Sequence, residues 1–440
     1  QEDIAAIEKQ LQDCEHYLES IRQNRDIHGI SLAITFEMRR ISQTIQRLRD
    51  LLYLLITKNY EQPFDTFMLL FKRLLAAESE KNSLSHQFTQ NTNLLAFQIT
   101  EHARKTGEHY ITNNKEEYLS MFKGAAGGGL VVSILVFTKL LIYYFKPAPI
   151  ALGLLYGLNY AVGFIIIHLL HFTLATKQPA MTASAIASAL DTDSPMGQQV
   201  RSLTTMIIKI VRSQFIALIG NVAVALPMAY LWAWVFYAVT GTHFATVEKA
   251  TQLIAELHPI HSLSLYYAGV AGVYLFVSGL LSGLHDNMCV FYNIPQRIEQ
   301  QPLLKKLLRP SIRQHIANYI KFNLGGIAGN FYLGMLLGIS GLLGLGFGVP
   351  LDIRHITFSA GNLGLSLAAL DHQIDGHTLF VTLVGIFSIG MVNLLVSFTL
   401  ALYVAVKSRG VTFFGFSSLL RRLLVEFLGN PLAFLLPPKE

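Results

Sequence analysis

Charged residues are scarce in this chain, and their scarcity decides the broad class of protein. Lys, Arg, Asp and Glu make up only 14% of the 440 residues, whereas 52% are hydrophobic. Soluble domains carry about 25% charged residues. The deficit and the mean hydropathy of +0.42 exclude an ordinary soluble domain and indicate an integral membrane protein.

Other absences exclude several kinds of site and segment. The two cysteines, Cys14 and Cys289, are too few for a disulfide framework or a cysteine zinc site. No glycine-rich phosphate loop and no strand-like alternation are visible. The first ten residues, QEDIAAIEKQ, lack the positive and apolar regions of a secretory signal. Because the first residue is also Gln and not Met, the chain is expected to be part of a longer protein.

Six apolar stretches are long enough to cross about 30 Å of hydrocarbon as helices. They are expected at residues 125–145, 150–175, 214–240, 263–284, 324–348 and 378–405. Three connections or tails (176–213, 285–323 and the chain after 405) hold four, six and five Lys or Arg residues, whereas the alternate connections hold one each. Because cytoplasmic loops collect Lys and Arg, both termini are expected in the cytoplasm.

A seventh apolar segment, ITFSAGNLGLSLAAL at 356–370, is too short to span comfortably, at about 22 Å. We expect it to be a re-entrant or interfacial segment. A polar cluster on the outer face, Asp352, Arg354 and His355, comes directly before it. A charge at such a boundary is costly unless it is paired, so Arg354 is expected to pair with Asp352 or another carboxylate. The alternative is a substrate gate on that face.

The expected fold class is therefore all-α: a polytopic membrane protein with three parts. Residues 1–123 form a cytoplasmic helical bundle, in which Ile41, Ile45 and Leu55 belong to one apolar helical face. Residues 124–411 form the six-helix transmembrane domain with the re-entrant or interfacial segment. Residues 412–440 form an amphipathic cytoplasmic tail, with Arg421 and Arg422 near anionic headgroups.

A set of polar residues is expected at one depth, at the inner ends of the helices. These candidates for a polar cavity are His168, His171, His285, Asp286, Asn287, Arg212 and Asn323. Ionisable groups at such depths face a bundle interior or a cavity and often mark a pathway. Anchoring and helix capping at the headgroups is the alternative interpretation.

Some other residues favour structural interpretations. The glycine stripe Gly334, Gly338, Gly341, Gly344 and Gly348 predicts close packing against another helix, with a gating helix as the alternative. Lys139 stands alone in the first span, within reach of the interface by snorkelling. Histidines gather in the expected outer connections, but their spacing matches no standard zinc pattern. No metal and no cofactor is expected.

Several unusual strings resemble a bacterial membrane-protein family catalogued as "site-specific recombinase". They occupy residues 153–184, 278–298, 323–341, 350–370 and 390–411, and include SGLLSGLHDNMCVFYNIPQRI and PLDIRHITFSAGNLGLSLAAL. The resemblance implies an inner-membrane protein whose relatives are longer at the N-terminus. The family name implies DNA strand exchange. However, tyrosine recombinases use an H-x-x-R box, and the third residue after His355 is Phe358.

The leading hypothesis is a bacterial inner-membrane protein that handles a lipid, small solute or partner protein through a polar intramembrane cavity. The alternatives are a membrane scaffold that recruits a cytoplasmic partner through the N-terminal helices, and a DNA recombinase, which we disfavour. An enzymatic activity is not indicated by any of these residues. The expected partners are membrane lipids, with no specific nucleic acid, and self-association is left open.

Overall fold

The protein is helical throughout the part of the chain that the structure describes. The computed structural model describes residues 2–23, 32–56, 61–80, 111–175, 196–408 and 416–437, and no β-strand occurs within these ranges. The all-α class expected from the sequence is confirmed. The chain divides into two compact units, Gln1–His102 with Asp286–Lys321, and Ala103–His285 with Phe322–Glu440. The boundaries expected at residues 123 and 411 stay predictions.

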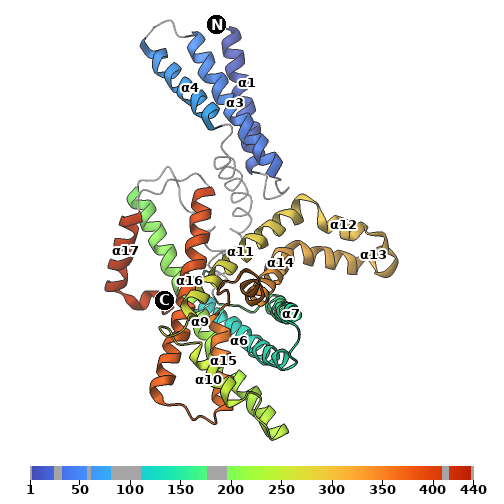
Figure 1. Cartoon of the computed structure of the whole chain (residues 1–440). Coiled ribbons are helices and arrows are strands. Elements are labelled where there is room, and N and C mark those ends of the chain that lie inside the picture. Colours follow the sequence, from blue (N-terminus) through green and yellow to red (C-terminus); the bar gives the residue numbers. More distant parts are fainter. Residues whose placement is uncertain are drawn as a thin grey trace. The chain divides into compact units, whose positions relative to one another are not determined.

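Three helices open the first unit: α1 (Glu2–Gln23), α3 (Leu32–Ile56) and α4 (Glu61–Glu80), with α3 packed against both others (Figure 1). Their core consists of Leu11, Leu18, Met38 and Ile45. Arg49 of α3 pairs with Glu8 and Glu15 of α1, at 3.0 Å in each case. Of the apolar face expected on α3, Ile45 is buried but Ile41 and Leu55 are exposed, so the described helices cover this face only in part.

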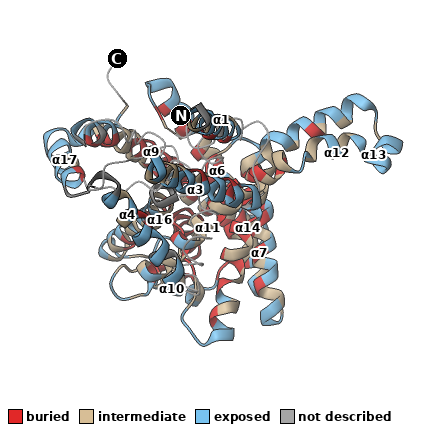
Figure 2. Ribbon diagram, turned by 90° about the horizontal axis from the view of Figure 1, so that it is seen from above, coloured by how far each residue is buried: buried red, intermediate tan, exposed pale blue. Residues whose placement is uncertain are grey.

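Two short helices in the same unit belong to the basic connection between the fourth and fifth spans. α12 (Ile294–Gln300) and α13 (Pro302–Leu307) have no buried residue, and Figure 2 shows α13 in the pale blue of exposed residues. Nη1 of Arg313 donates a hydrogen bond to the carbonyl oxygen of Glu299 at 3.1 Å. This contact ties the end of α12 to the first turn of α14 (Pro310–Phe347).

The six expected spans are confirmed as helices. Among the described residues, six helices are long and apolar enough to cross a membrane. They are α6 (Lys115–Tyr144), α7 (Pro149–Leu169), α9 (Met196–Thr240), α11 (Ser264–Phe291), α14 (Pro310–Phe347) and α16 (Gly376–Ser408). α9 and α14 begin well before their apolar stretches. Lys, Arg and Gln are good helix formers, so these helices continue into polar sequence.

The short apolar segment forms α15 (Ile356–Ala369), which is mostly buried. Its first N–H, of Ile356, donates to Oδ1 of Asn393 at 3.2 Å, and Asn393 lies about 25 Å along α16 from its start. At the other end of α15, Nε2 of His372 lies 2.7 Å from the hydroxyl of Tyr230, in the last third of α9. The chain thus enters the bundle before α15 and leaves it along α15, as expected for a re-entrant segment.

Glycines let α14 approach α7 closely. A Cβ added at Gly334 would meet the backbone of Ala161, and one added at Gly338 would meet the backbone of Gly157. At Gly344 it would meet the chain at Leu351, which follows α14. The close packing against another helix that was expected for the glycine stripe is confirmed at Gly334 and Gly338.

Two helices outside the spans complete the second unit. α10 (Val247–Ala255) lies in a connection expected to be a loop, and Oγ1 of Thr246 caps it by accepting from the N–H of Lys249 at 3.2 Å. α17 (Phe416–Gly429) is the expected amphipathic helix of the tail. The residues after α17 pack on the bundle, where the Tyr118 hydroxyl donates to the carbonyl oxygen of Leu435 at 2.6 Å.

Candidate functional site

A fully buried asparagine of α9, Asn221, fixes the start of α15. Its Oδ1 accepts hydrogen bonds from the N–H of Ala175 and the hydroxyl of Thr357, both at 3.0 Å. Its Nδ2 donates to the carbonyl oxygens of Ala125, at 2.6 Å, and Thr173, at 2.9 Å. One side chain with all four hydrogen bonds made therefore joins α6, α9, α15 and the segment that follows α7.

Asn393 of α16 also holds the start of α15 by hydrogen bonds. Its Nδ2 donates to the carbonyl oxygens of Ala268, at 2.8 Å, and Arg354, at 2.9 Å, while its Oδ1 accepts from Ile356. His355 is the N-cap of α15, and its Nδ1 accepts from the N–H of Thr357 at 3.3 Å. A helix end buried in the bundle leaves N–H groups that need such partners.

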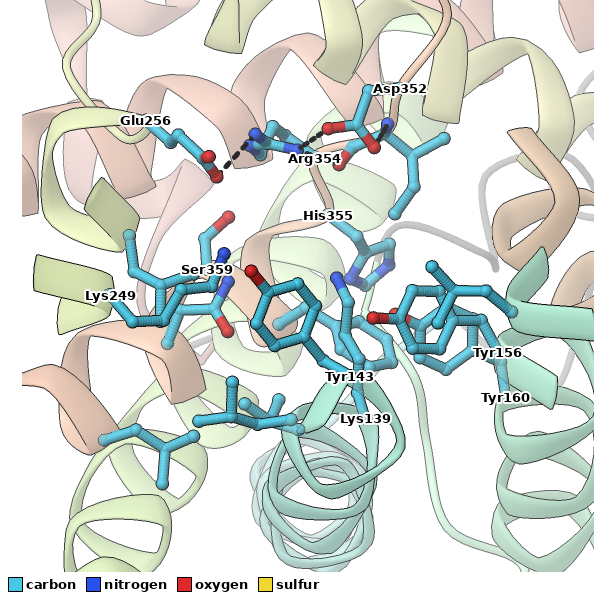
Figure 3. A pocket seen from close by; sticks show the side chains of 18 residues that line it. Lys139, Tyr143, Tyr156, Tyr160, Lys249, Glu256, Asp352, Arg354, His355 and Ser359 are labelled. Atoms are coloured by element: carbon cyan, nitrogen blue, oxygen red, sulfur yellow. Dashed lines mark hydrogen bonds and ion pairs between the residues drawn. The ribbon is translucent and has the colours of Figure 1, made fainter. Parts of the chain in front are cut away.

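Arg354, just before α15, is held between two carboxylates (Figure 3). Its Nη1 lies 2.6 Å from Oδ2 of Asp352, and its Nη2 lies 2.9 Å from Oε2 of Glu256. Nη1 also donates to the carbonyl oxygen of Ile353 at 2.8 Å. The expected pairing of Arg354 with Asp352 is confirmed. Glu256, which follows α10, is a partner that local sequence did not indicate.

The charges of this cluster, outside the six spans, stabilise one another. Burial by itself would raise the pKa of Asp352, but Arg354 and, after it, Lys139 outweigh burial, so the pKa lies below its usual range. Burial lowers the pKa of Arg354, but Asp352 and Glu256 outweigh it and the net shift is upward. Burial lowers the pKa of His355 to about 4, although a backbone hydrogen bond with Ala175 by itself would raise this pKa. His355 is therefore neutral at pH 7.

A cavity of about 270 Å³ lies beside this cluster. α6, α7, α10, α15 and the chain before α15 contribute to its wall. Figure 3 shows polar side chains around one space, among them Lys139, Tyr143, Tyr156, Tyr160 and Lys249. On α15, His355, Ser359 and Asn362 recur every three or four residues and so share the face that lines the cavity.

The cavity has more positive than negative charge available to a ligand. Its ionisable lining comprises three cations (Lys139, Lys249, Arg354) and two carboxylates (Asp352, Glu256). Both carboxylates pair with Arg354. Among the described residues, neither lysine makes an ion pair within 4.0 Å: Nζ of Lys139 lies 5.4 Å from the centre of the Tyr156 ring, and Nζ of Lys249 lies 4.5 Å from that of Tyr143.

Ser359 adds an unpartnered hydroxyl to the wall. The residue is buried, and its Oγ has no hydrogen-bond partner among the described residues. An unsatisfied buried polar group costs about 1–3 kcal/mol.

Most of this site was missed from the sequence. Lys139 was interpreted as a snorkelling residue, and the tyrosines and Ser359 were not singled out. A signal was present, because Lys139 with Tyr143 and Tyr156 with Tyr160 are spaced by four residues on two helices joined by a short connection. Residues so placed lie on one helical face at similar depth.

The residues expected to form an inner cavity lie on four different helices or just after them. The His168 ring, at the end of α7, packs against Gly326 of α14, where an added Cβ would meet it. Nδ1 of His285 lies 2.8 Å from the carbonyl oxygen of Leu281, one turn earlier in α11. Nε of Arg212 in α9 donates to the carbonyl oxygen of Ala433 at 3.0 Å.

The other members of that set are His171, in the turn after α7 with φ of 55°, Asp286 and Asn287 in α11, and Asn323 in α14. Asn287 is buried. None of these residues lines the cavity beside α15. That the whole set lines one inner space stays a prediction.

The histidines of the expected outer connections make separate local contacts. Nε2 of His243 lies 3.4 Å from Oδ2 of Asp371, and Nδ1 of His258 accepts from the N–H groups of Ile260 and His261. In the part of the chain that is described, no three His, Cys, Asp or Glu side chains gather as a metal site requires.

Comparison with known proteins gives one match. A family model described as "Site-specific recombinase" matches residues 1–437. Neither the curated proteins nor the solved structures contain a match to the chain. The family match thus covers the helical bundle as well as the membrane helices and the cavity.

Proposed function

The chain belongs to the family described as site-specific recombinase, and we propose that it is a membrane protein that binds a small anionic ligand in the cavity beside α15. The observation that carries the proposal is the placement of Lys139 and Lys249 on one cavity, with no carboxylate paired to either among the described residues. Ligand sites combine apolar walls with a few convergent polar groups, and this wall combines tyrosines with lysines and a free hydroxyl.

The polarity of the site supports an anion over a cation. A cation would have to compete with Arg354 for Asp352 and Glu256, at a site already positive. An anion meets two ammonium groups that no carboxylate neutralises within 4.0 Å among the described residues. Ligand binding at a re-entrant helix start also agrees with the rule that non-helical backbone at membrane depth lies against protein or a cavity.

Calorimetry on the full chain in a neutral detergent tests the proposal, with inorganic phosphate and monobutyl phosphate as probes. Saturable binding is expected, and the double variant Lys139→Met, Lys249→Met should weaken it about tenfold or more, since tenfold corresponds to about 1.4 kcal/mol. Lys123→Met is the matched control, because Lys123 is an exposed lysine on the same helix α6. Absence of saturable binding, or equal binding by all variants, would refute the proposal.

The expected orientation belongs to the same proposal. With both termini in the cytoplasm of a bacterial inner membrane, the cavity side of α15 would face outward. The Lys and Arg asymmetry of the connections supports this orientation.

The family description provides a second candidate, DNA strand exchange. Two features of the site disfavour it: Arg354 is held by two carboxylates, and His355 is fully buried in the bundle. We expect the purified chain to show neither salt-dependent binding of a defined DNA site nor its cleavage. Rejoined DNA products would establish the recombinase instead.

Exposed apolar residues on α3 and α4 favour a third candidate, a scaffold for a cytoplasmic protein. They include Leu55, Phe64, Phe67, Phe71 and Leu75. Photocrosslinking in cells from position 67 tests it. A cross-link to one soluble protein supports the scaffold, and a cross-link only to a second copy of the chain supports self-association.

A further inference from the structure

A second cavity of about 240 Å³ adjoins the cationic cavity, between α7 and α14. The two share six wall residues: Lys139, Leu152, Tyr156, Tyr160, Asp352 and Ile353. Beyond these shared residues, the second cavity is lined only by glycines and apolar side chains. We call it the α7–α14 groove.

We propose that the ligand is an anionic lipid, whose charged headgroup lies between Lys139 and Lys249 and one of whose acyl chains lies in the α7–α14 groove. This inference rests on the proposed function and names the class of ligand. Lys139 stands at the junction of the two cavities, so one molecule could contact it with its headgroup and continue into the groove.

The groove exists because α14 touches α7 at one glycine and leaves open space at the next glycine along the helix. At Gly338 an added Cβ would meet the backbone of Gly157, so the helices touch. At Gly341, which also lines the groove, no atom lies within 4 Å of the position that a Cβ would take. Glycine is therefore needed for packing at Gly338, whereas at Gly341 its missing side chain leaves open space.

The far wall of the groove faces out of the bundle. Leu345, one turn after Gly341, is 71% exposed, and Leu342 and Leu337 continue the apolar lining. An acyl chain entering from the surrounding bilayer would meet apolar side chains from this edge up to Tyr156. A small hydrophilic anion would gain nothing from this part of the wall.

The surplus of positive charge selects the headgroup. A zwitterionic headgroup brings its own cation into a site that already has three, whereas an anionic headgroup brings none. Hydrogen bonds between ammonium groups and an anionic oxygen are stronger than neutral ones. Asn362 and Ser359 of α15 line the same cavity.

The decisive variant fills the groove without touching the headgroup site. Gly341→Phe places a ring in open space on α14, and Gly346→Phe is its matched control. Gly346 is exposed on the same helix, also has no atom within 4 Å of its Cβ position, and does not line the groove.

The experiment reconstitutes the full chain in nanodiscs of phosphatidylcholine with an equal amount of phosphatidylglycerol, and counts the lipids that stay bound by native mass spectrometry after transfer to detergent. We expect the wild type and Gly346→Phe to retain phosphatidylglycerol over phosphatidylcholine. Gly341→Phe should lose this preference, as should the double variant of Lys139 and Lys249. Monobutyl phosphate should bind to Gly341→Phe as tightly as to the wild type.

Two outcomes would overturn the inference in distinguishable ways. If phosphates bind and depend on the lysines but phosphatidylglycerol is not retained, or is retained equally by Gly341→Phe, the ligand is a free anion and the proposed function stands without the lipid. If neither phosphates nor phosphatidylglycerol bind, both proposals fail together.

Discussion

Arg354→Ala is the perturbation whose cost follows most directly from the structure. The Arg354 side chain is 12% exposed and makes charged hydrogen bonds to Asp352 and Glu256, whose side chains are 47% and 34% exposed. Removing one partner of a fully buried pair costs 3–5 kcal/mol or so, because a charge is left unpaired. Here water reaches both carboxylates after the change, which reduces the cost to about 2–3 kcal/mol.

Thermal unfolding of the full chain in neutral detergent measures this cost. A loss of about 2–3 kcal/mol should lower Tm by about 2–5 °C, because the shift per kcal/mol becomes smaller as the unfolding unit becomes larger. Asp352→Asn should lower Tm less, since Arg354 keeps Glu256. The double variant Arg354→Ala, Asp352→Asn should cost less than the sum of the single changes, because the two groups interact. An unchanged Tm in Arg354→Ala, with loss of ligand binding, would refute the structural role and favour a gate.

Three further predictions follow from the expected topology, the buried histidine and the helix packing. In a variant without native cysteines, an external thiol reagent should modify Thr242→Cys and not Gln301→Cys; the reverse pattern would invert the membrane orientation. Unfolded histidine takes up a proton below about pH 6.5, but folded His355 does so only below about pH 4, so stability should fall as pH drops through this window. His355→Asn keeps an N-cap and should flatten that dependence of Tm; an identical pH profile would exclude His355 as its source. Gly338→Leu should lower Tm by several degrees by forcing α14 off α7, whereas Gly346→Leu should not, and equal effects would contradict the close contact.

Local patterns were enough to predict the membrane helices and the re-entrant segment. Hydropathy and length are properties of single stretches, and α15 was recognisable because it is apolar but too short. The Asp352–Arg354 pair was predictable for the same reason, since the partners are two residues apart and a lone buried charge is costly.

Contacts between distant segments were not predictable. Glu256 lies 98 residues before Arg354 along the chain, and only the return of the chain after α10 brings it close. Nothing in the local sequence marks Asn221 and Asn393 as the two supports of one helix start. Gly338 and Gly341 belong to one stripe in the sequence, yet one packs against backbone and the other faces open space. Which neighbour each glycine meets depends on how the two helices cross.

The expected inner set of polar residues and the cavity beside α15 differ in whether their charged and polar groups have partners. At the helix ends expected on the inner side, Arg212 and His285 have hydrogen bonds to backbone oxygens, which is what anchoring requires. Beside α15, two lysines without ion pairs and an unpartnered serine hydroxyl face one cavity. Apolar residues there would make a more stable bundle. Residues that make a fold less stable than it could be are expected at functional sites. The cavity beside α15 is therefore the stronger candidate for the functional site.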